Sequence, residues 1–254
     1  MIFLEKYIRS NFYLYVASRE LYNFFFSLFF YESECQVFKY LKKRSNIKII
    51  DIGSSNLSFS SYISRFFYKS NFFCFEPLLH FYNSKKLQNN NKLYIFNKAC
   101  ADKSKKLVLF TPFKKILTLK IYLKYFSSYN LKFIKKNLIK FFNSKSNFFY
   151  DKIIVNTIKI DNLNLKPDLI KLDIEGYEYK ALLGAVKTIK KFKPIIYIEN
   201  PSIVVDKFFY SLNYKKFHYK KDTKKLSIVN KNKKSSYNYL FIYNKAIFCS
   251  NIFE

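Results

Sequence analysis

Residues 47–53 read IKIIDIG and residues 169–176 read LIKLDIEG, and in each an apolar run leads into an acid followed by a glycine. The chain has only three glycines in 254 residues: Gly53, Gly176 and Gly184. Glycine is needed where the backbone turns tightly or lies close to a ligand. Two of the three therefore mark turns that follow predicted strands, and we expect the chemistry of the protein there.

The hydrophobic pattern alternates between short strand-like runs and longer helical ones. Residues 1–46 are predicted to form an N-terminal helical extension, followed by one domain over residues 47–254. Near-continuous apolar strands separated by helices are typical of a doubly wound, mostly parallel α/β sheet. Strands are predicted at residues 47–52, 71–75, 92–97, 153–160, 169–172 and 195–198, and helices at about 55–68, 78–88 and 177–191.

The composition gives a misleading signal about partners. A formal net charge of +29 is typical of proteins that bind nucleic acid or an anionic surface. However, only four of the 46 basic residues are arginine, the residue that phosphate-reading proteins favour. Abundant Lys, Asn, Ile, Phe and Tyr with scarce Gly, Ala and Arg indicate an AT-biased coding sequence, which explains most of the charge.

The four cysteines, Cys35, Cys74, Cys100 and Cys249, are scattered and show no spacing typical of a metal site. We therefore expect no bound metal and no disulfide framework, which suits a reducing cytoplasm. The apolar run at residues 24–31 is shorter than the roughly 20 residues that a membrane span needs.

In a doubly wound sheet, ligands bind at the carboxyl ends of the strands. Polar residues at those ends are Asp51, Glu76, Asn97, Asp173 and Glu199. A dinucleotide site needs the pattern GxGxxG, whereas residues 53–58 read GSSNLS and keep only the first glycine. A carboxylate at residue 51 would also repel phosphates.

S-adenosylmethionine fits these residues better, because it carries positive charge and a ribose but no phosphate. Glu76 ends the second strand 25 positions after Asp51, where a ribose-binding acid is expected. The alternatives are that Asp51 caps the next helix and that Glu76 is a solvated strand-end acid.

Six ordered segments resemble the FkbM-type methyltransferases, which are S-adenosylmethionine-dependent O-methyltransferases with a Rossmann-like class I fold. The resemblance covers residues 47–241, and its most specific part is IKLDIEGYE followed by LLGA. The runs near residues 217–220, 226–230 and 238–243 resemble the closing antiparallel hairpin of a methyltransferase sheet. The segments are IIDIGSSNLSFS, CFEPLLHFY, NKACAD, VNTIKIDNL, PDLIKLDIEGYEYKALLGA and PIIYIEN.

The resemblance implies a role for each candidate residue. The turn from Asp51 through Gly53, Ser54 and Ser55 corresponds to the methionine side of the cofactor site, Glu76 to the ribose-binding acid and Asp102 to a position near the adenine. Asp173 and Glu175 correspond to an acidic pair that faces the transferable methyl group and the acceptor hydroxyl. The chain departs from the family pattern at Ser55, where an asparagine is usual, and at Leu57, where a glycine is usual.

Methyl transfer needs an oriented acceptor oxygen and a base that takes its proton. We expect Asp173 to be the base or the acceptor-orienting acid, supported by Glu175, with Lys171 as an ion-pair neighbour. The alternative is that Lys171, Glu175 and Glu178 form an electrostatic network around a helix start.

Residues 112–150 interrupt the alternation, and they contain nine lysines and no acid. We expect a basic helical insertion, with an apolar stripe at Leu131, Ile134, Leu138 and Phe141. One interpretation is a cap over the acceptor site that also touches anionic lipid or a charged glycan carrier. The other is a helix packed on its own core, with ordinary solvated lysines.

The sequence therefore predicts a cytoplasmic O-methyltransferase that acts on a hydroxyl, of a sugar in a cell-surface glycan or of a related small metabolite. A peripheral contact with a membrane through residues 112–150 is left open. The alternatives are an RNA-binding protein or RNA methyltransferase, and a degenerate methyltransferase fold that serves as a binding module.

Overall fold

The structure is a computed structural model, and it describes residues 14–18, 33–78, 87, 89–123, 126–142, 148–229 and 237–254. The helix predicted at residues 78–88 lies almost entirely outside the described residues, and so does most of the helical extension over residues 1–46. Within that extension, residues 14–18 are α-helical and the 3₁₀ helix η1 spans Ser33–Tyr40.

An eight-stranded sheet forms the main body, in the order β11-β10-β12-β9-β8-β1-β2-β3. The strands from β9 to β3 in this order are parallel, and β12 and β11 pair antiparallel with their neighbours. This is the predicted doubly wound, mostly parallel α/β fold, and its strand order reverses beside β1. The strands are β1 (Lys48–Ile52), β2 (Asn71–Phe75), β3 (Lys92–Phe96), β8 (Leu169–Leu172), β9 (Ile195–Glu199), β10 (Lys215–Lys220), β11 (Lys225–Ile228) and β12 (Asn238–Ile242).

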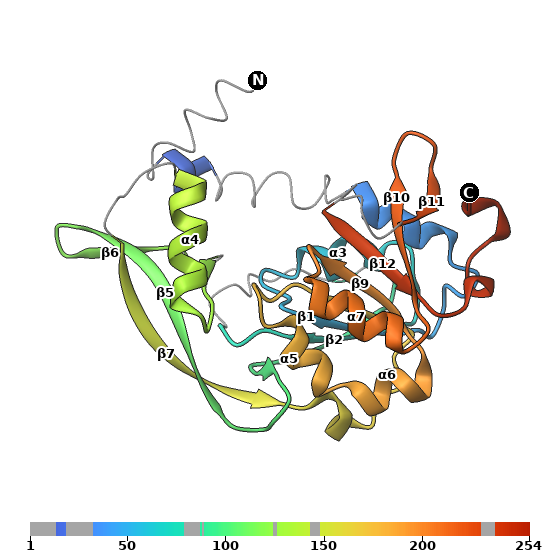
Figure 1. Ribbon diagram of the computed structural model, residues 1–254, viewed down its shortest axis with the longest axis horizontal. Coiled ribbons are helices and arrows are strands. Elements are labelled where there is room, and N and C mark those ends of the chain that lie inside the picture. The colour runs from blue at the N-terminus through green and yellow to red at the C-terminus, as the bar shows by residue number, and fades with distance from the viewer. Residues whose placement is uncertain are drawn as a thin grey trace.

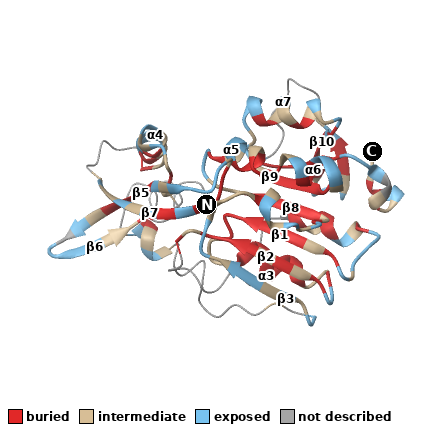
Figure 2. Ribbon diagram, turned by 90° about the horizontal axis from the view of Figure 1, so that it is seen from below, coloured by how far each residue is buried: buried red, intermediate tan, exposed pale blue. Residues whose placement is uncertain are grey.

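Both faces of this sheet are covered, which explains why its central strands are apolar throughout. Because side chains alternate along a strand, Ile49 of β1 packs in one core cluster with η1 and α3 (Ser58–Ser64), whereas Ile50 packs in the opposite one. The second cluster contains side chains of α5 (Glu178–Leu183), α6 (Val186–Phe192) and α7 (Ile203–Ser211). Figure 2 shows this buried centre in red.

The single helix predicted over residues 177–191 is two helices, because α5 ends before Gly184 and α6 begins at Val186. A Cβ atom built on Gly184 would lie 1.9 Å from the carbonyl oxygen of Ala101. The glycine therefore allows the end of α5 to touch a backbone segment that is distant in the sequence. Short 3₁₀ helices complete the body at η4 (Ile160–Leu163), η5 (Lys245–Ile247) and η6 (Ser250–Ile252).

A second, four-stranded sheet forms an arm that projects from the main body (Figure 1). The prediction of a helical insertion at residues 112–150 is therefore wrong for much of that range. Long-range pairing overrides the local pattern, since β5 and β7 run antiparallel from Lys106 opposite Asn156 to Phe113 opposite Phe149. The elements are β4 (Ala99–Cys100), β5 (Lys106–Ile116), β6 (Leu119–Tyr122), α4 (Leu131–Phe142) and β7 (Phe149–Ile158).

The basic helix itself is present as α4, and it packs on the arm. Ile134, Leu138 and Phe142 are buried in a cluster with Leu123 and Tyr15. The lysines of α4, at positions 132, 135, 136 and 140, are exposed. The apolar stripe of this helix is thus used for packing within the protein.

Left-handed backbone is common in this glycine-poor chain. Thirteen non-glycine residues have positive φ within the described part of the chain, and six of them are asparagines. Asparagine tolerates this conformation better than most residues. Leu57 and Leu117 adopt it as well, with φ of 61° and 53°.

No helix within the described ranges is long and apolar enough to cross a membrane. The described residues also contain no cluster of three or more His, Cys, Asp or Glu side chains that could hold a metal ion.

Candidate functional site

A cavity of about 260 Å³ opens at the carboxyl ends of β1, β2 and β8, where the order of the main sheet reverses. This is the position at which doubly wound sheets bind ligands. The arm closes one side of the cavity. The described residues that line it are Ile52, Gly53, Ser55, Phe75, Glu76, Pro77, Leu78, Ala99, Cys100, Leu107, Leu109, Ser127, Ser128, Tyr129, Asp173, Ile174, Glu175, Tyr177 and Glu199.

The charged residues that line this cavity are all acids. Glu76, Asp173, Glu175 and Glu199 contribute, and no lysine, arginine or histidine does so among the described lining residues. The chain as a whole has 46 basic and 17 acidic residues. An acidic cavity in such a basic protein favours a ligand that carries positive charge.

Glu76 lies where β2 ends, and its carboxylate accepts two backbone hydrogen bonds. Ser55 N–H donates to Oε2 at 3.0 Å, and Leu78 N–H donates to Oε1 at 2.9 Å. The residue is 7% exposed, and burial raises the pKa of its carboxyl to about 7, although both hydrogen bonds oppose the shift. Glu76 is therefore a held, buried acid at the cavity wall, rather than the solvated strand-end acid of the alternative interpretation.

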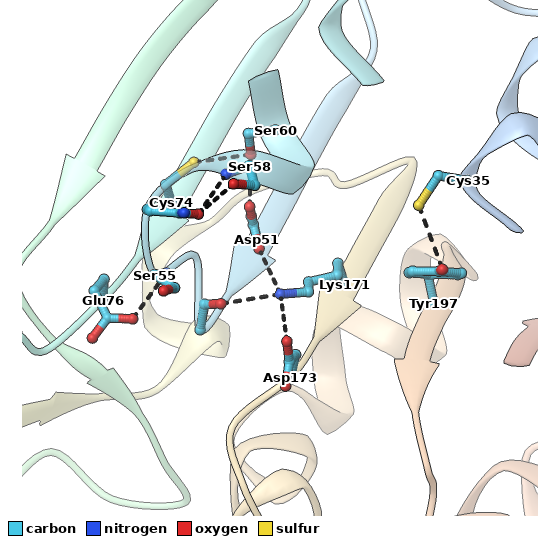
Figure 3. Close-up of polar contacts among 12 residues, drawn as sticks. Cys35, Asp51, Ser55, Ser58, Ser60, Cys74, Glu76, Lys171, Asp173 and Tyr197 are labelled. Atoms are coloured by element: carbon cyan, nitrogen blue, oxygen red, sulfur yellow. Dashed lines mark hydrogen bonds and ion pairs between the residues drawn. The ribbon is translucent and has the colours of Figure 1, made fainter. Parts of the chain in front are cut away.

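Lys171 joins two of the predicted acids from beneath the cavity (Figure 3). Its Nζ donates to the carbonyl oxygen of Gly53 at 3.0 Å and lies 3.3 Å from Asp173 Oδ2 and 3.5 Å from Asp51 Oδ1. Lys171 and Asp51 are buried, whereas the Asp173 side chain is 36% exposed. The lysine therefore offsets part of the charge of the two acids and orients Asp173 at the cavity wall.

Asp51 is fully buried and does not line the cavity itself. Burial raises the pKa of its carboxyl, whereas Lys171 acts in the opposite direction. Its Oδ2 accepts a hydrogen bond from Ser60 Oγ of α3 at 2.7 Å, and that hydroxyl also lies 3.3 Å from Cys74 Sγ. Asp51 thus ties the first strand to the first helix.

The loop after β1 wraps around the end of β2. Gly53 N–H and Ser54 N–H both donate to the carbonyl oxygen of Phe75. A Cβ atom on Gly53 would lie 1.9 Å from the carbonyl oxygen of Asp173, so the glycine lets the turns after β1 and β8 touch. The Ser54 hydroxyl is buried without a hydrogen-bond partner in the described part of the structure. At Leu57, the unusual residue noted in the sequence, the backbone is left-handed, which is the conformation that favours glycine.

The turn after β8 is held by the arm, a contact that the sequence did not reveal. Ser128 Oγ donates to the carbonyl oxygen of Glu175 at 3.0 Å. The rings of Tyr129 and Tyr177 meet edge to face, with centroids 4.4 Å apart. The sequence does not predict Ser127, Ser128 and Tyr129 as cavity residues, because they reach the cavity only when the arm folds back against the main body. The sole sequence signal was the expectation of a cap at residues 112–150.

The structure brings most of the predicted site residues together, with Asp102 as the exception. Gly53, Ser55, Glu76, Asp173 and Glu175 line the cavity, and Asp51, Ser54 and Lys171 lie directly behind it. The Asp102 carboxylate instead lies 3.4 Å from Lys180 Nζ of α5 and is not a lining residue. Asn97, at the end of β3, donates to the carbonyl oxygens of Glu76 and Pro77 and so fixes the chain after β2.

Glu178 lies at the start of α5, the position that the alternative interpretation gave it, whereas a network with Lys171 and Glu175 stays a prediction. Its Oε1 accepts a hydrogen bond from Gly176 N–H at 2.9 Å. Burial raises the pKa of its carboxyl. It is separate from Glu175, whose side chain lines the cavity.

The doubly wound sheet and the acidic cavity at its switch point define a Rossmann-like α/β protein. The Methyltransferase FkbM domain matches residues 51–224, and the chain therefore belongs to the FkbM methyltransferase family. This confirms the resemblance drawn from the sequence. The family implies a cofactor of the S-adenosylmethionine type. No curated protein matches the chain.

Two solved structures align with the chain. Methyltransferase FkbM from Methylobacillus flagellatus KT aligns with 15% identity and a TM-score of 0.42, over 80% of this chain and 47% of that one. The chain thus spans about half the length of that relative. The precorrin-6y C5,15-methyltransferase from Geobacter metallireducens GS-15 aligns with 12% identity and a TM-score of 0.34, over 82% of this chain and 84% of that one.

Proposed function

We propose that this protein is an S-adenosylmethionine-dependent O-methyltransferase that acts on a hydroxyl, of a sugar in a cell-surface glycan or of a related small metabolite. The observation that carries the proposal is the acidic lining of the cavity in a chain of net charge +29. When bound, S-adenosylmethionine supplies an activated methyl group on a positively charged sulfonium. Acidic side chains around an anionic ligand would instead oppose binding.

The residues at the cavity fit this cofactor. Glu76 would accept hydrogen bonds from the ribose hydroxyls, since its carboxylate is buried at the wall and already held by two N–H groups. The turn formed by Gly53, Ser54 and Ser55 would hold the methionine part, since Gly53 and Ser55 line the cavity. Asp102 would contact the adenine only if its ion pair with Lys180 were broken.

Asp173 is the proposed base. It lines the cavity, and Lys171 holds one of its oxygens at 3.3 Å, which orients the carboxylate. Glu175 lies two residues further along the same turn, and its backbone is fixed by Ser128. Lys171 does not line the cavity, so we assign it a positioning role beneath the acids. A base in attack geometry contributes about 10²–10⁴-fold to rate.

Calorimetry with S-adenosylmethionine tests the cofactor assignment. Wild type should bind, and Glu76→Ala should lose most of the affinity. Glu76→Gln keeps one acceptor and should bind with intermediate affinity. Asp222→Asn removes an exposed acid in the turn between β10 and β11, and it should bind like wild type. No binding by wild type would favour the binding-module alternative.

Turnover tests the base. Asp173→Asn should lower methyl transfer to an accepted hydroxyl compound by about 10²-fold or more while cofactor affinity changes little. The acceptor can be found by screening sugars for release of S-adenosylhomocysteine. Full activity of Asp173→Asn would reject the assignment.

We propose a cytoplasmic location. None of the described cysteines forms a disulfide, and Cys35, Cys74 and Cys100 are buried. Thiols that are not in disulfides suit a reducing compartment.

A further inference from the structure

The turn that joins β5 and β6 presents two leucines to solvent. Leu117 is 94% exposed and Leu119 is 70% exposed. Exposed turns are usually built from Gly, Asn, Asp or Ser, and Leu117 also adopts left-handed backbone that disfavours leucine. These side chains bury almost nothing in the folded chain, so folding does not explain them.

This turn is the end of the arm remote from the main sheet, as both Figure 1 and Figure 2 show. The eleven residues of β5 carry it outward, and a strand of that length spans about 35 Å. The two leucines are thus the outermost part of a projecting element.

Lysines surround the leucines on the strands that lead to the turn. Lys115 lies opposite Lys120, directly below the tip, and Lys114 precedes them. The ammonium groups stand over aromatic rings, with Lys115 Nζ 5.4 Å from the centroid of Phe149 and Lys120 Nζ 4.7 Å from that of Phe113. Residues 112–150 contain no acid, and Asp151, which follows, is paired with Lys120 at 2.8 Å. The tip is therefore apolar, and Lys114 and Lys115 form a cationic collar below it, since the charge of Lys120 is offset by Asp151.

The apolar face of α4 does not offer a similar surface, because Ile134 and Leu138 are buried against the arm. Its lysines nevertheless add to the positive charge of the arm. The turn between β10 and β11 is a useful contrast, since residues 220–225 read KKDTKK. That turn has lysines without exposed leucines, so charge alone does not distinguish the β5–β6 tip.

We propose that the β5–β6 turn is a membrane-docking element, which inserts Leu117 and Leu119 at the boundary between headgroups and acyl chains of an anionic phospholipid bilayer. The lysines of the collar would contact the headgroups, because their long stems can run beside apolar groups while the ammonium stays in the polar layer. Nucleic acid is the less suitable occupant, since leucine neither stacks on bases nor bonds to phosphate.

The base of the same arm belongs to the cavity. Leu107 and Leu109 of β5 line it, and Ser128 is bonded to the turn after β8. Docking at the tip would therefore orient the cavity relative to the bilayer. The inference itself does not depend on the methyltransferase assignment.

Co-sedimentation of the full chain with vesicles tests the inference. Wild type should bind vesicles that contain phosphatidylserine and should bind phosphatidylcholine vesicles weakly. Leu117→Asn combined with Leu119→Thr suits the local backbone and should weaken binding by about tenfold or more. Ile154→Thr alters an apolar side chain of the same arm that is 67% exposed, and its binding should equal that of wild type.

The basic residues are tested in matched pairs. Lys114→Gln with Lys115→Gln should weaken binding by about fivefold per lysine. Lys221→Gln with Lys224→Gln, at the far β10–β11 turn, removes the same charge and should have a smaller effect. Calorimetry with S-adenosylmethionine on every variant separates this inference from the proposed function, because cofactor affinity should not change.

A spectroscopic test uses the absence of tryptophan from the sequence. Leu117→Trp should shift its emission to shorter wavelength when anionic vesicles are added, whereas Ile154→Trp should not. The inference is overturned if the leucine variant binds vesicles like wild type or if Leu117→Trp shows no shift. It is also overturned if single-stranded RNA competes for the tip lysines while the leucines make no difference to vesicle binding.

Discussion

The raised pKa of Glu76 predicts that nucleoside binding depends on pH. Burial raises this pKa to about 7, so the group ionises in the neutral range in the ligand-free protein. Ribose hydroxyls donate hydrogen bonds, and they therefore bind the carboxylate form in preference to the acid. Binding should tighten as pH rises through about 7, and ligand should lower the pKa of Glu76.

The magnitude follows from the ionised fraction. With a pKa of about 7, the carboxylate is about one-eleventh populated at about pH 6 and about ten-elevenths at about pH 8. If only that form binds, the dissociation constant should fall by about tenfold across this range. A tenfold change in affinity is easily resolved by calorimetry.

The assay should use 5′-methylthioadenosine, which keeps the ribose and adenine but lacks the amino acid whose own titration would interfere. Wild type is compared with Glu76→Gln, which cannot ionise at this position. The variant should show a flat affinity, whereas Asp222→Asn should follow wild type. Because Asp51 is present in all three proteins, any contribution from its titration cancels in the comparison. An equal slope in wild type and Glu76→Gln would refute the reasoning.

The close backbone contacts of the glycines and the buried ion pair of Lys171 with Asp51 give further predictions. Each is checked by measuring the free energy of unfolding in urea. Gly53→Ala should cost more than about 4 kcal/mol, since its Cβ would lie 1.9 Å from the carbonyl oxygen of Asp173, and unchanged stability would contradict the contact. Gly176→Ala should cost only about 1–2 kcal/mol. A φ of 90° is strained for alanine, but the added Cβ would lie 3.7 Å from its nearest neighbour, the ring of Phe133. Lys171→Met should cost about 3–5 kcal/mol by leaving the buried Asp51 carboxylate without its partner. Adding Asp51→Asn should restore part of that loss, and a purely additive double variant would show that the two do not interact.

The main sheet could be predicted closely because each central strand is buried on both faces and bounded by turns. The strands at residues 71–75 and 169–172 have the predicted limits. The break between α5 and α6 was not predicted, because it depends on the contact of Gly184 with Ala101, which no local pattern reveals. The strands of the arm were partly missed for a similar reason, since β5 and β7 stabilise each other across the intervening α4.

The acids of the site could be predicted because they follow strands whose carboxyl ends must meet at one edge. Glu76 and Asp173 reach the same cavity in this way. The expectation for Asp102 rests on a resemblance alone, and in the structure that carboxylate pairs with Lys180 and does not line the cavity. The contribution of Ser128 and Tyr129 depends on how the arm folds back, which the sequence does not encode locally.

Proteins usually use glycine both for left-handed turns and for close contact between two backbones, and in this chain the two uses fall largely on different residues. Where only an unusual turn is required, the chain often uses asparagine or lysine, as at Asn164 and Lys193. Gly53 and Gly184 remain where two backbones touch, and no side chain of any kind fits. A side chain at either position would push apart two segments that are distant in the sequence, so these glycines mark contacts that the architecture cannot lose.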